Sequence, residues 1–181
     1  DISGRAVNSY EIALEQRQYA RVVVEHRGVA LILRLVDAGV VVNETRTDEA
    51  DGRDVVEVAS ERATVFQIRV ATRFPQFDAG SYAIAIGEIR AASDRDRLLQ
   101  EARGRYAESN RLFQTGAYAD AQSAAERALE IRERLLGEEH GDVANALGQL
   151  GMICAARNQP ARAETLYRRA LAINEHLFGP D

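Results

Sequence analysis

The sequence has no lysine, no tryptophan and only one cysteine among its 181 residues. All 23 basic residues are therefore arginines, against 28 acidic residues. Without lysine, phosphate loops of the Gly-Lys-Ser/Thr type, Schiff-base catalysis and kinase chemistry are excluded. The single cysteine, Cys154, excludes an internal disulfide bond and a zinc site built from several cysteines. Three histidines, His26, His140 and His176, leave few candidates for a general base.

Charge and hydropathy argue against two further classes of protein. The net charge of −5 is spread evenly, with 11 arginines and 14 acidic residues in residues 1–90 and 12 and 14 in residues 91–181. Neither half therefore offers a basic surface for nucleic acid. No apolar run approaches the roughly 20 residues that cross a bilayer, so we expect no membrane insertion of this segment. The chain begins at Asp1 without an initiator methionine, which we interpret as removal of upstream sequence.

Valine divides the chain into halves of different class. Residues 1–90 hold 14 valines and only Val143 follows, whereas leucine rises from 4 to 11. β-branched residues favour strands, and leucine and alanine favour helices. The first half repeats with period two and has turn signals at Asp37–Gly39 and Asp78–Gly80. Its apolar stripes are Tyr10, Ile12, Leu14; Ala20, Val22, Val24; Leu31, Leu33, Leu35; Val40–Val42; Val55, Val56, Val58; Phe66, Ile68, Val70; and Tyr82, Ile84, Ile86. About seven short strands predict an antiparallel β-sandwich over residues 1–91.

The second half begins with a helix-start signal. Ser93 precedes Asp96 by three residues, which resembles a capping box with Asp in place of Glu. From Ser93 to Phe178 the only proline is Pro160, and the apolar pattern is helical. The sequence therefore predicts an all-α domain over residues 92–181.

This helical half contains an internal repeat of 42 residues. Sliding it onto itself gives nine identities in the 19 positions from 119 to 137. The identical pairs include Arg127 with Arg169, Ala128 with Ala170, Leu129 with Leu171, Ile131 with Ile173, and Gly137 with Gly179. Repeated helix pairs that cannot bury their own apolar faces predict an α-α superhelix.

The repeat resembles the tetratricopeptide repeat family. The second unit carries that family's apolar and small residues at the family's spacing: Leu147, Leu150, Gly151, Ala163, Tyr167 and Ala170. The first unit is weaker, and we place the two repeats at about residues 102–143 and 144–181. Small residues at Gly151, Ala163 and Ala170 would let the helices approach, with Leu150 and Tyr167 filling the space between them. Cys154 stands where the family usually has an aromatic residue.

Two finer resemblances concern the repeat type and the first half. The 42-residue unit and its ending Phe178-Gly179-Pro180-Asp181 are similar to kinesin-light-chain repeats, which implies further repeats beyond Asp181. The segments Tyr19–Glu25 and Gly80–Tyr82, placed ahead of a repeat array, resemble pre-peptidase sandwiches of bacterial proteins that continue into a CHAT peptidase domain. No catalytic residue of such a peptidase can be carried over onto this chain. We favour an extracytoplasmic over a cytoplasmic location.

Isolated reactive residues have simpler explanations than catalysis. We expect Cys154 to pack in the helical core, His26 to be structural, and His140 and His176 to lie on the surface. The arginines of the helices, such as Arg134 four residues after Glu130, are interpreted as solvated ion pairs.

The acidic segment Asp48–Asp54 has enough oxygen ligands for Ca²⁺. Its spacing does not match Asp-x-Asp-x-Asp-Gly, and Arg53 adds a competing charge, so we interpret it as a solvated hairpin loop. We expect neither a metal nor any other cofactor.

The resemblance implies a peptide-binding surface on the first helix of each repeat. The positions there that are free of the family's packing roles are Arg103, Tyr106, Asn110 and Phe113 in the first unit, and Asn145, Gly148, Gln149 and Met152 in the second. Aromatic, amide, guanidinium and thioether groups together suit an extended or helical peptide. The alternative is that this face packs against the chain's own β domain or further repeats. A lysine-based carboxylate clamp is impossible, which leaves Arg103 as the basic group.

Three functional hypotheses follow. The first is a non-enzymatic scaffold that binds protein segments, because the repeat is clear and no catalytic constellation is present. The second is the regulatory region of a larger enzyme such as a CHAT-type peptidase. The third, an extracytoplasmic carbohydrate- or surface-binding β module, ranks last because the sequence lacks tryptophan for stacking on sugars.

Overall fold

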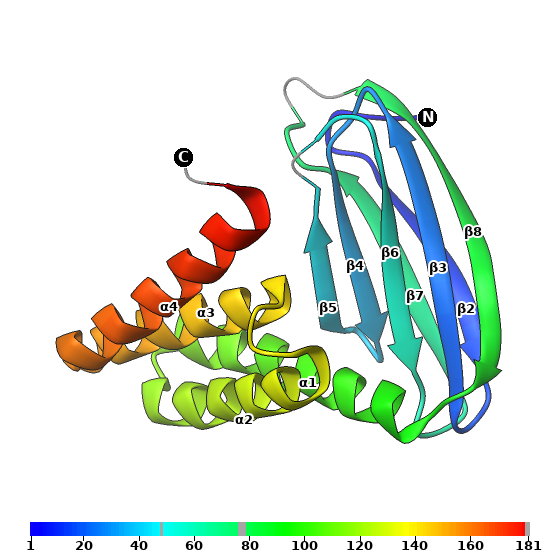
Figure 1. Ribbon diagram of the computed structural model, residues 1–181. Coiled ribbons are helices and arrows are strands. Elements are labelled where there is room, and N and C mark those ends of the chain that lie inside the picture. The colour runs from blue at the N-terminus through cyan, green and yellow to red at the C-terminus, as the bar shows by residue number, and fades with distance from the viewer. Residues whose placement is uncertain (48, 76–78, 180–181) are drawn as a thin grey trace. The chain divides into compact units, whose positions relative to one another are not determined.

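The computed structural model describes residues 1–47, 49–75 and 79–179 (Figure 1). It contains two compact units, residues 1–97 and residues 98–181. Two antiparallel sheets form the first unit, and four helices follow in the chain. The predicted fold class, a β-sandwich followed by helical repeats, is confirmed.

The sandwich consists of two four-stranded sheets. One sheet has the strand order β1-β8-β3-β6, and the other has the order β2-β7-β4-β5. The strands are β1 (Ile2–Ser3), β2 (Val7–Leu14), β3 (Gln18–Arg27), β4 (Leu31–Asp37), β5 (Val40–Arg46), β6 (Gly52–Ala59), β7 (Thr64–Thr72) and β8 (Ala79–Ala91). All seven predicted apolar stripes lie in β2 to β8. Ala38 and Gly39, both with positive φ, form the predicted turn between β4 and β5, whereas Asp78 of the other predicted turn lies outside the described residues.

The core lies between the two sheets because each strand turns alternate side chains inward. Val24, Leu31, Val58 and Val70, from four different strands, are fully buried there. The apolar residues of the period-two pattern are therefore the ones that face the core.

Carboxylates of the acidic segment between β5 and β6 form hydrogen bonds with residues at the end of β3 and just after it. His26 is 3% exposed, with Nδ1 2.9 Å from the Val29 carbonyl oxygen and Nε2 2.9 Å from Oδ2 of Asp54. Oδ1 of Asp51 accepts a hydrogen bond of 2.8 Å from the Gly28 N–H. The structural role predicted for His26 is confirmed, and these two carboxylates stabilise the segment; Asp48 lies outside the described residues.

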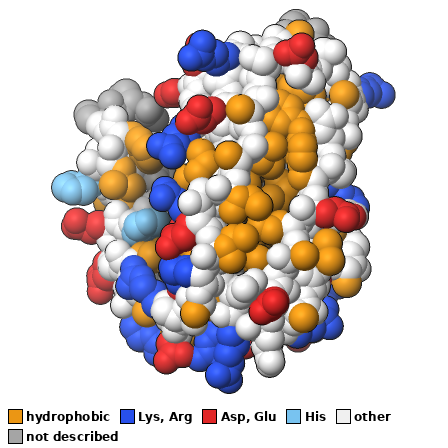
Figure 2. Space-filling view, turned by 90° about the vertical axis from the view of Figure 1, so that its right-hand side faces the viewer, with side chains coloured by type: hydrophobic (Ala, Val, Ile, Leu, Met, Phe, Trp, Pro, Cys, Tyr) orange, Lys and Arg blue, Asp and Glu red, His pale blue; other side chains and the backbone are white. Residues whose placement is uncertain are grey.

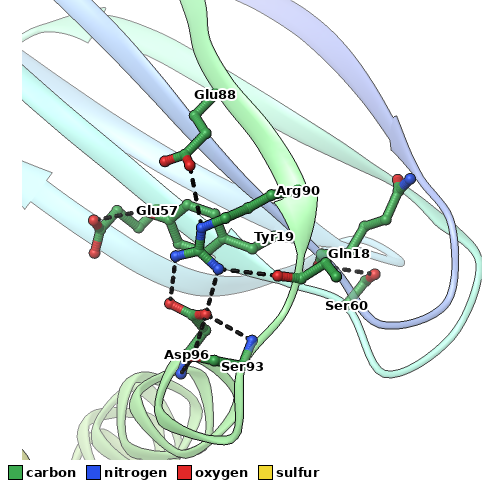
Figure 3. Close-up of polar contacts among 9 residues, drawn as sticks. Gln18, Tyr19, Glu57, Ser60, Glu88, Arg90, Ser93 and Asp96 are labelled. Atoms are coloured by element: carbon green, nitrogen blue, oxygen red, sulfur yellow. Dashed lines mark hydrogen bonds and ion pairs between the residues drawn. The ribbon is translucent and has the colours of Figure 1, made fainter.

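The passage from β8 into the first helix is held by an arginine (Figure 3). The Arg90 guanidinium lies 3.9 Å from the centroid of the Tyr19 ring and donates two hydrogen bonds of 2.6 and 3.0 Å to Asp96. Asp96 also accepts a 2.8 Å hydrogen bond from the Ser93 N–H, and its own N–H donates to Oγ of Ser93 at 3.2 Å. The predicted capping box is confirmed. Hydrogen bonding to Arg90 lowers the pKa of Asp96, and burial together with a 2.7 Å hydrogen bond to Glu57 raises the pKa of Tyr19.

The helices form two pairs. They are α1 (Asp94–Gln114), α2 (Tyr118–Leu136), α3 (Gly141–Ala156) and α4 (Pro160–Phe178). Gly137 ends α2 with φ of 90°, and Gly179 ends α4 with φ of 88°. Each glycine donates its N–H to the carbonyl four residues earlier, Glu133 at 3.1 Å and Glu175 at 3.0 Å. The 42-residue repeat therefore extends to the cap geometry of its second helices.

The packing of α3 on α4 uses the small residues of the repeat. A Cβ atom on Gly151 would lie 2.7 Å from Cε1 of Tyr167, so only glycine permits this approach. Cys154 is fully buried in a cluster with Leu150, Ile153 and Ala163, which confirms its predicted place in the core.

Candidate peptide-binding surface

The first helix of each pair, α1 and α3, carries the proposed binding residues at helical spacing. Tyr106, Asn110 and Phe113 follow at intervals of four and three residues on α1, and Asn145, Gln149 and Met152 do so on α3. Residues with this spacing share one helix face. Each set of three thus forms a stripe along one side of its helix.

Exposure separates these residues into three groups. Asn145 and Met152 are exposed, the latter at 44%, whereas Gln149 is buried at 4%. The half-buried members are Arg103, Tyr106, Asn110, Phe113 and Gly148. Asn145 and Met152 therefore present the largest fraction of their side chains to a ligand.

Phe113 contributes to packing as well as to the surface. Its ring contacts the helical core cluster and lies 5.4 Å from the ring of Tyr118, at an angle of 54°. This contact ties the end of α1 to the beginning of α2. Replacing Phe113 would therefore change stability along with any binding.

Gln149 combines burial with an unused donor. Its Nε2 atom has no hydrogen-bond partner among the described residues, although the side chain is 4% exposed. Leaving a buried amide donor unpaired costs about 1–3 kcal/mol. Because Nε2 is itself buried, a ligand could contact it only if the Gln149 side chain moved.

Arg132 on α2 adds a positive charge that the sequence interpretation missed. It is 6% exposed, its guanidinium lies 4.6 Å from the centroid of the Tyr106 ring, and Nη1 donates a 2.9 Å hydrogen bond to the Asp142 carbonyl. Burial lowers the pKa of Arg132, and the nearby charge of Arg103 adds to this effect. No sequence pattern reveals this role, because the aromatic neighbour of Arg132, Tyr106, lies on a different helix.

Several other helix arginines form ion pairs between helices as well as along them. Arg162 and Arg169 of α4 contact Glu126 and Glu133 of α2 at 2.7 and 2.6 Å. Glu130 was expected to pair with Arg134. Among the described residues it instead contacts Arg127, at 3.0 Å. Glu126 and Glu133 therefore help to hold α2 against α4.

The histidines of the helical unit lie on its surface, as predicted. His140 precedes α3 and accepts a 3.0 Å hydrogen bond from the Asp142 N–H through Nδ1, which makes it the N-cap of that helix. Nε2 of His176 lies 3.7 Å from Oε2 of Glu139, and both side chains are exposed. Both residues therefore serve the ends of helices rather than a common site.

The described part of the chain has neither a metal-binding cluster nor a membrane-spanning helix. No group of three or more His, Cys, Asp or Glu side chains is placed to hold a metal ion there. Within the same residues, none of the helices has the length and apolar character needed to cross a membrane.

The comparisons with known proteins bear on the helical part. Residues 111–176 match the family model of the tetratricopeptide repeat. The matched segment begins near the end of α1 and runs through α2 and α3 into α4. No curated protein matches the chain. The likeness supports a protein-interaction module in the helical half.

Proposed function

We propose that this protein is a non-enzymatic scaffold that binds a peptide segment of a partner protein along α1 and α3. The observation that carries the proposal is the exposed and half-buried polar and apolar surface on α1 and α3, in a helical half that matches tetratricopeptide repeats. Asn145 and Met152 offer an amide and a flexible thioether, and Tyr106 and Asn110 offer an aromatic edge and a second amide. Such groups suit peptide recognition by side-chain and backbone contacts together.

The charge of this surface favours an acidic peptide. The Arg132 guanidinium lies 4.6 Å from the centroid of the Tyr106 ring, and Arg103 is close enough to influence it, while the Asp142 charge acts in the opposite direction. Two guanidinium groups near one aromatic side chain attract negative charge to the surface around it. We therefore expect a glutamate, an aspartate or a terminal carboxylate in the bound segment.

The length of the second helices supports a finer proposal on the repeat type. α2 and α4 each have 19 residues and end at equivalent glycines. These features suit the 42-residue kinesin-light-chain type, which resembles this sequence in having a long second helix.

Affinity capture with surface variants tests the scaffold proposal. The triple variant Tyr106→Ala, Asn110→Ala, Asn145→Ala should lose most captured partner, because three contacts at a well-packed site are together worth several kcal/mol. The matched control is Arg168→Ala, which removes a side chain 78% exposed on α4. Capture that is equal for the triple variant, the control and the parent chain would refute the proposed surface.

A further inference from the structure

Strand β8 has one largely unoccupied edge. On one side it pairs with β3 from Ser81 to Ala91, and on the other β1 pairs only with Ala79 and Gly80. In the described part of the chain, no strand follows β1 along the second edge. A run of backbone N–H and C=O groups beyond Gly80 therefore remains available for pairing.

Inward-facing side chains are exposed beside this edge. Ile86 pairs with Val22 and Ile89 with Ala20, and both of these β3 partners are core residues at most 2% exposed. Directly paired residues share a sheet face, so Ile86 and Ile89 also face the inside of the sandwich. Nevertheless they are 57% and 47% exposed. The sandwich is thus open at this edge, and Figure 2 shows an apolar strip running along it.

The opening is bridged at one end by two tyrosines. The hydroxyl groups of Tyr10 on β2 and Tyr82 on β8 are 2.7 Å apart, and Nδ2 of Asn8 donates a 2.7 Å hydrogen bond to Tyr82. Burial and the hydrogen bond to Tyr10 raise the pKa of Tyr82 to about 12. We call the apolar strip formed by Tyr10, Tyr82, Ile84, Ile86 and Ile89 the open seam.

We infer that the open seam is a strand-acceptor site for an extended segment of a partner polypeptide. The segment runs antiparallel to β8 and in line with β1, because β1 already pairs in this direction on the same edge. Its apolar side chains occur at every second position, so that they cover Ile84, Ile86 and Ile89 while the others face solvent. It is uncharged opposite residues 81–87, since that stretch of β8 has no charged residue.

A second copy of β8 fits this edge less well. Pairing along the whole free stretch about a two-fold axis at Ile86 would set Ile84 opposite Glu88 and Tyr82 opposite Arg90. Pairing about Ile84 would stop at Gly87, because β1 occupies Gly80, and would leave Ile89 uncovered. A separate strand with apolar residues at alternate positions avoids both mismatches.

A designed peptide tests the site on the chain of 181 residues. The probe has about ten residues that alternate valine and threonine between arginine ends, and the control peptide has the same composition with its valines consecutive. We expect fluorescence anisotropy to show binding of the alternating peptide only. Hydrogen exchange should slow at amides within residues 81–91, which is the signature of an added strand.

Two matched variants place the peptide on the seam. Ile86→Arg should weaken binding about tenfold or more, because it buries a charge under the added strand. Val65→Arg should bind as the parent does, since Val65 is 50% exposed on β7, at the opposite side of that strand from the core. Both variants change exposed residues, and thermal unfolding should confirm that each remains folded.

Four results would overturn the inference. Equal binding of both peptides, or binding unaffected by Ile86→Arg, removes the strand-acceptor site. A dimer in sedimentation that Ile86→Arg dissociates assigns the edge to a second copy. A longer natural form of the chain that leaves the peptide unbound, while residues 1–181 bind it, assigns the edge to a strand of the same polypeptide.

Discussion

At the scale of single residues, Gly151 sets how closely α3 approaches α4. A methyl group there would meet Cε1 of Tyr167 at 2.7 Å, so Gly151→Ala should lower the free energy of unfolding by about 1–3 kcal/mol through overpacking. Gly148 on the same helix has open space around its Cβ position, so Gly148→Ala should raise stability by up to about 1 kcal/mol. Urea unfolding followed by circular dichroism measures the free energy of unfolding of both variants. Equal effects of the two substitutions would contradict this account of the helix contact.

Residue roles were predictable where one element decides them. The burial of Cys154 follows from its place in an apolar helical stripe, and the structural role of His26 follows from its place at the end of an apolar strand stripe. The sequence could not reveal that Arg90 stacks on Tyr19, because sheet pairing brings these distant residues together. Arg132 was missed for the same reason, since its aromatic neighbour Tyr106 belongs to another helix.

At the scale of elements, the beginning of α1 depends on the charge of Asp96. Its pKa lies below the usual value of 3.8 because of the hydrogen bonds from Arg90 and Ser93. A lowered pKa in the folded state contributes stability above the pKa of the unfolded chain, and this contribution is lost as the pH falls through the folded value. Asp96→Asn should therefore lower the thermal unfolding midpoint at pH 7, and the difference from the parent should shrink toward pH 3. A difference that is constant over this range would show that ionisation of Asp96 is irrelevant.

The strands were predictable from their period, and the exceptions have local causes. β1 has only two residues, too few to show an alternation. The predicted stripe in β8 ended at Ile86, whereas the strand continues to Ala91. The register against β3 shifts there, since Arg21 pairs with Glu88 and Val22 with Ile86, leaving Gly87 as an extra residue. Such a bulge moves Ile89 out of the period of two, so the sequence pattern hides its inward orientation.

At the scale of the whole molecule, the reactivity of the single thiol, that of Cys154, measures how often the helical unit opens. Cys154 is fully buried in the helical unit, and burial raises the pKa of its thiol. A disulfide reagent should therefore react with the native chain at least about a hundredfold more slowly than with the urea-unfolded chain, because reaction requires the helices to open. The rate should rise with loss of the helical signal in circular dichroism. Equal rates in the native and unfolded chain would contradict the packing of Cys154.

The equivalent glycine caps have a consequence for how such a chain can change in length. Gly137 and Gly179 end their helices with φ values of 90° and 88° and bond to equivalent carbonyls, so the backbone leaves each helix pair in the same local conformation. A gene segment that encodes 42 residues, copied or lost between these points, preserves the local geometry at both junctions. Array length can then vary by whole repeats during evolution without a new turn having to be found.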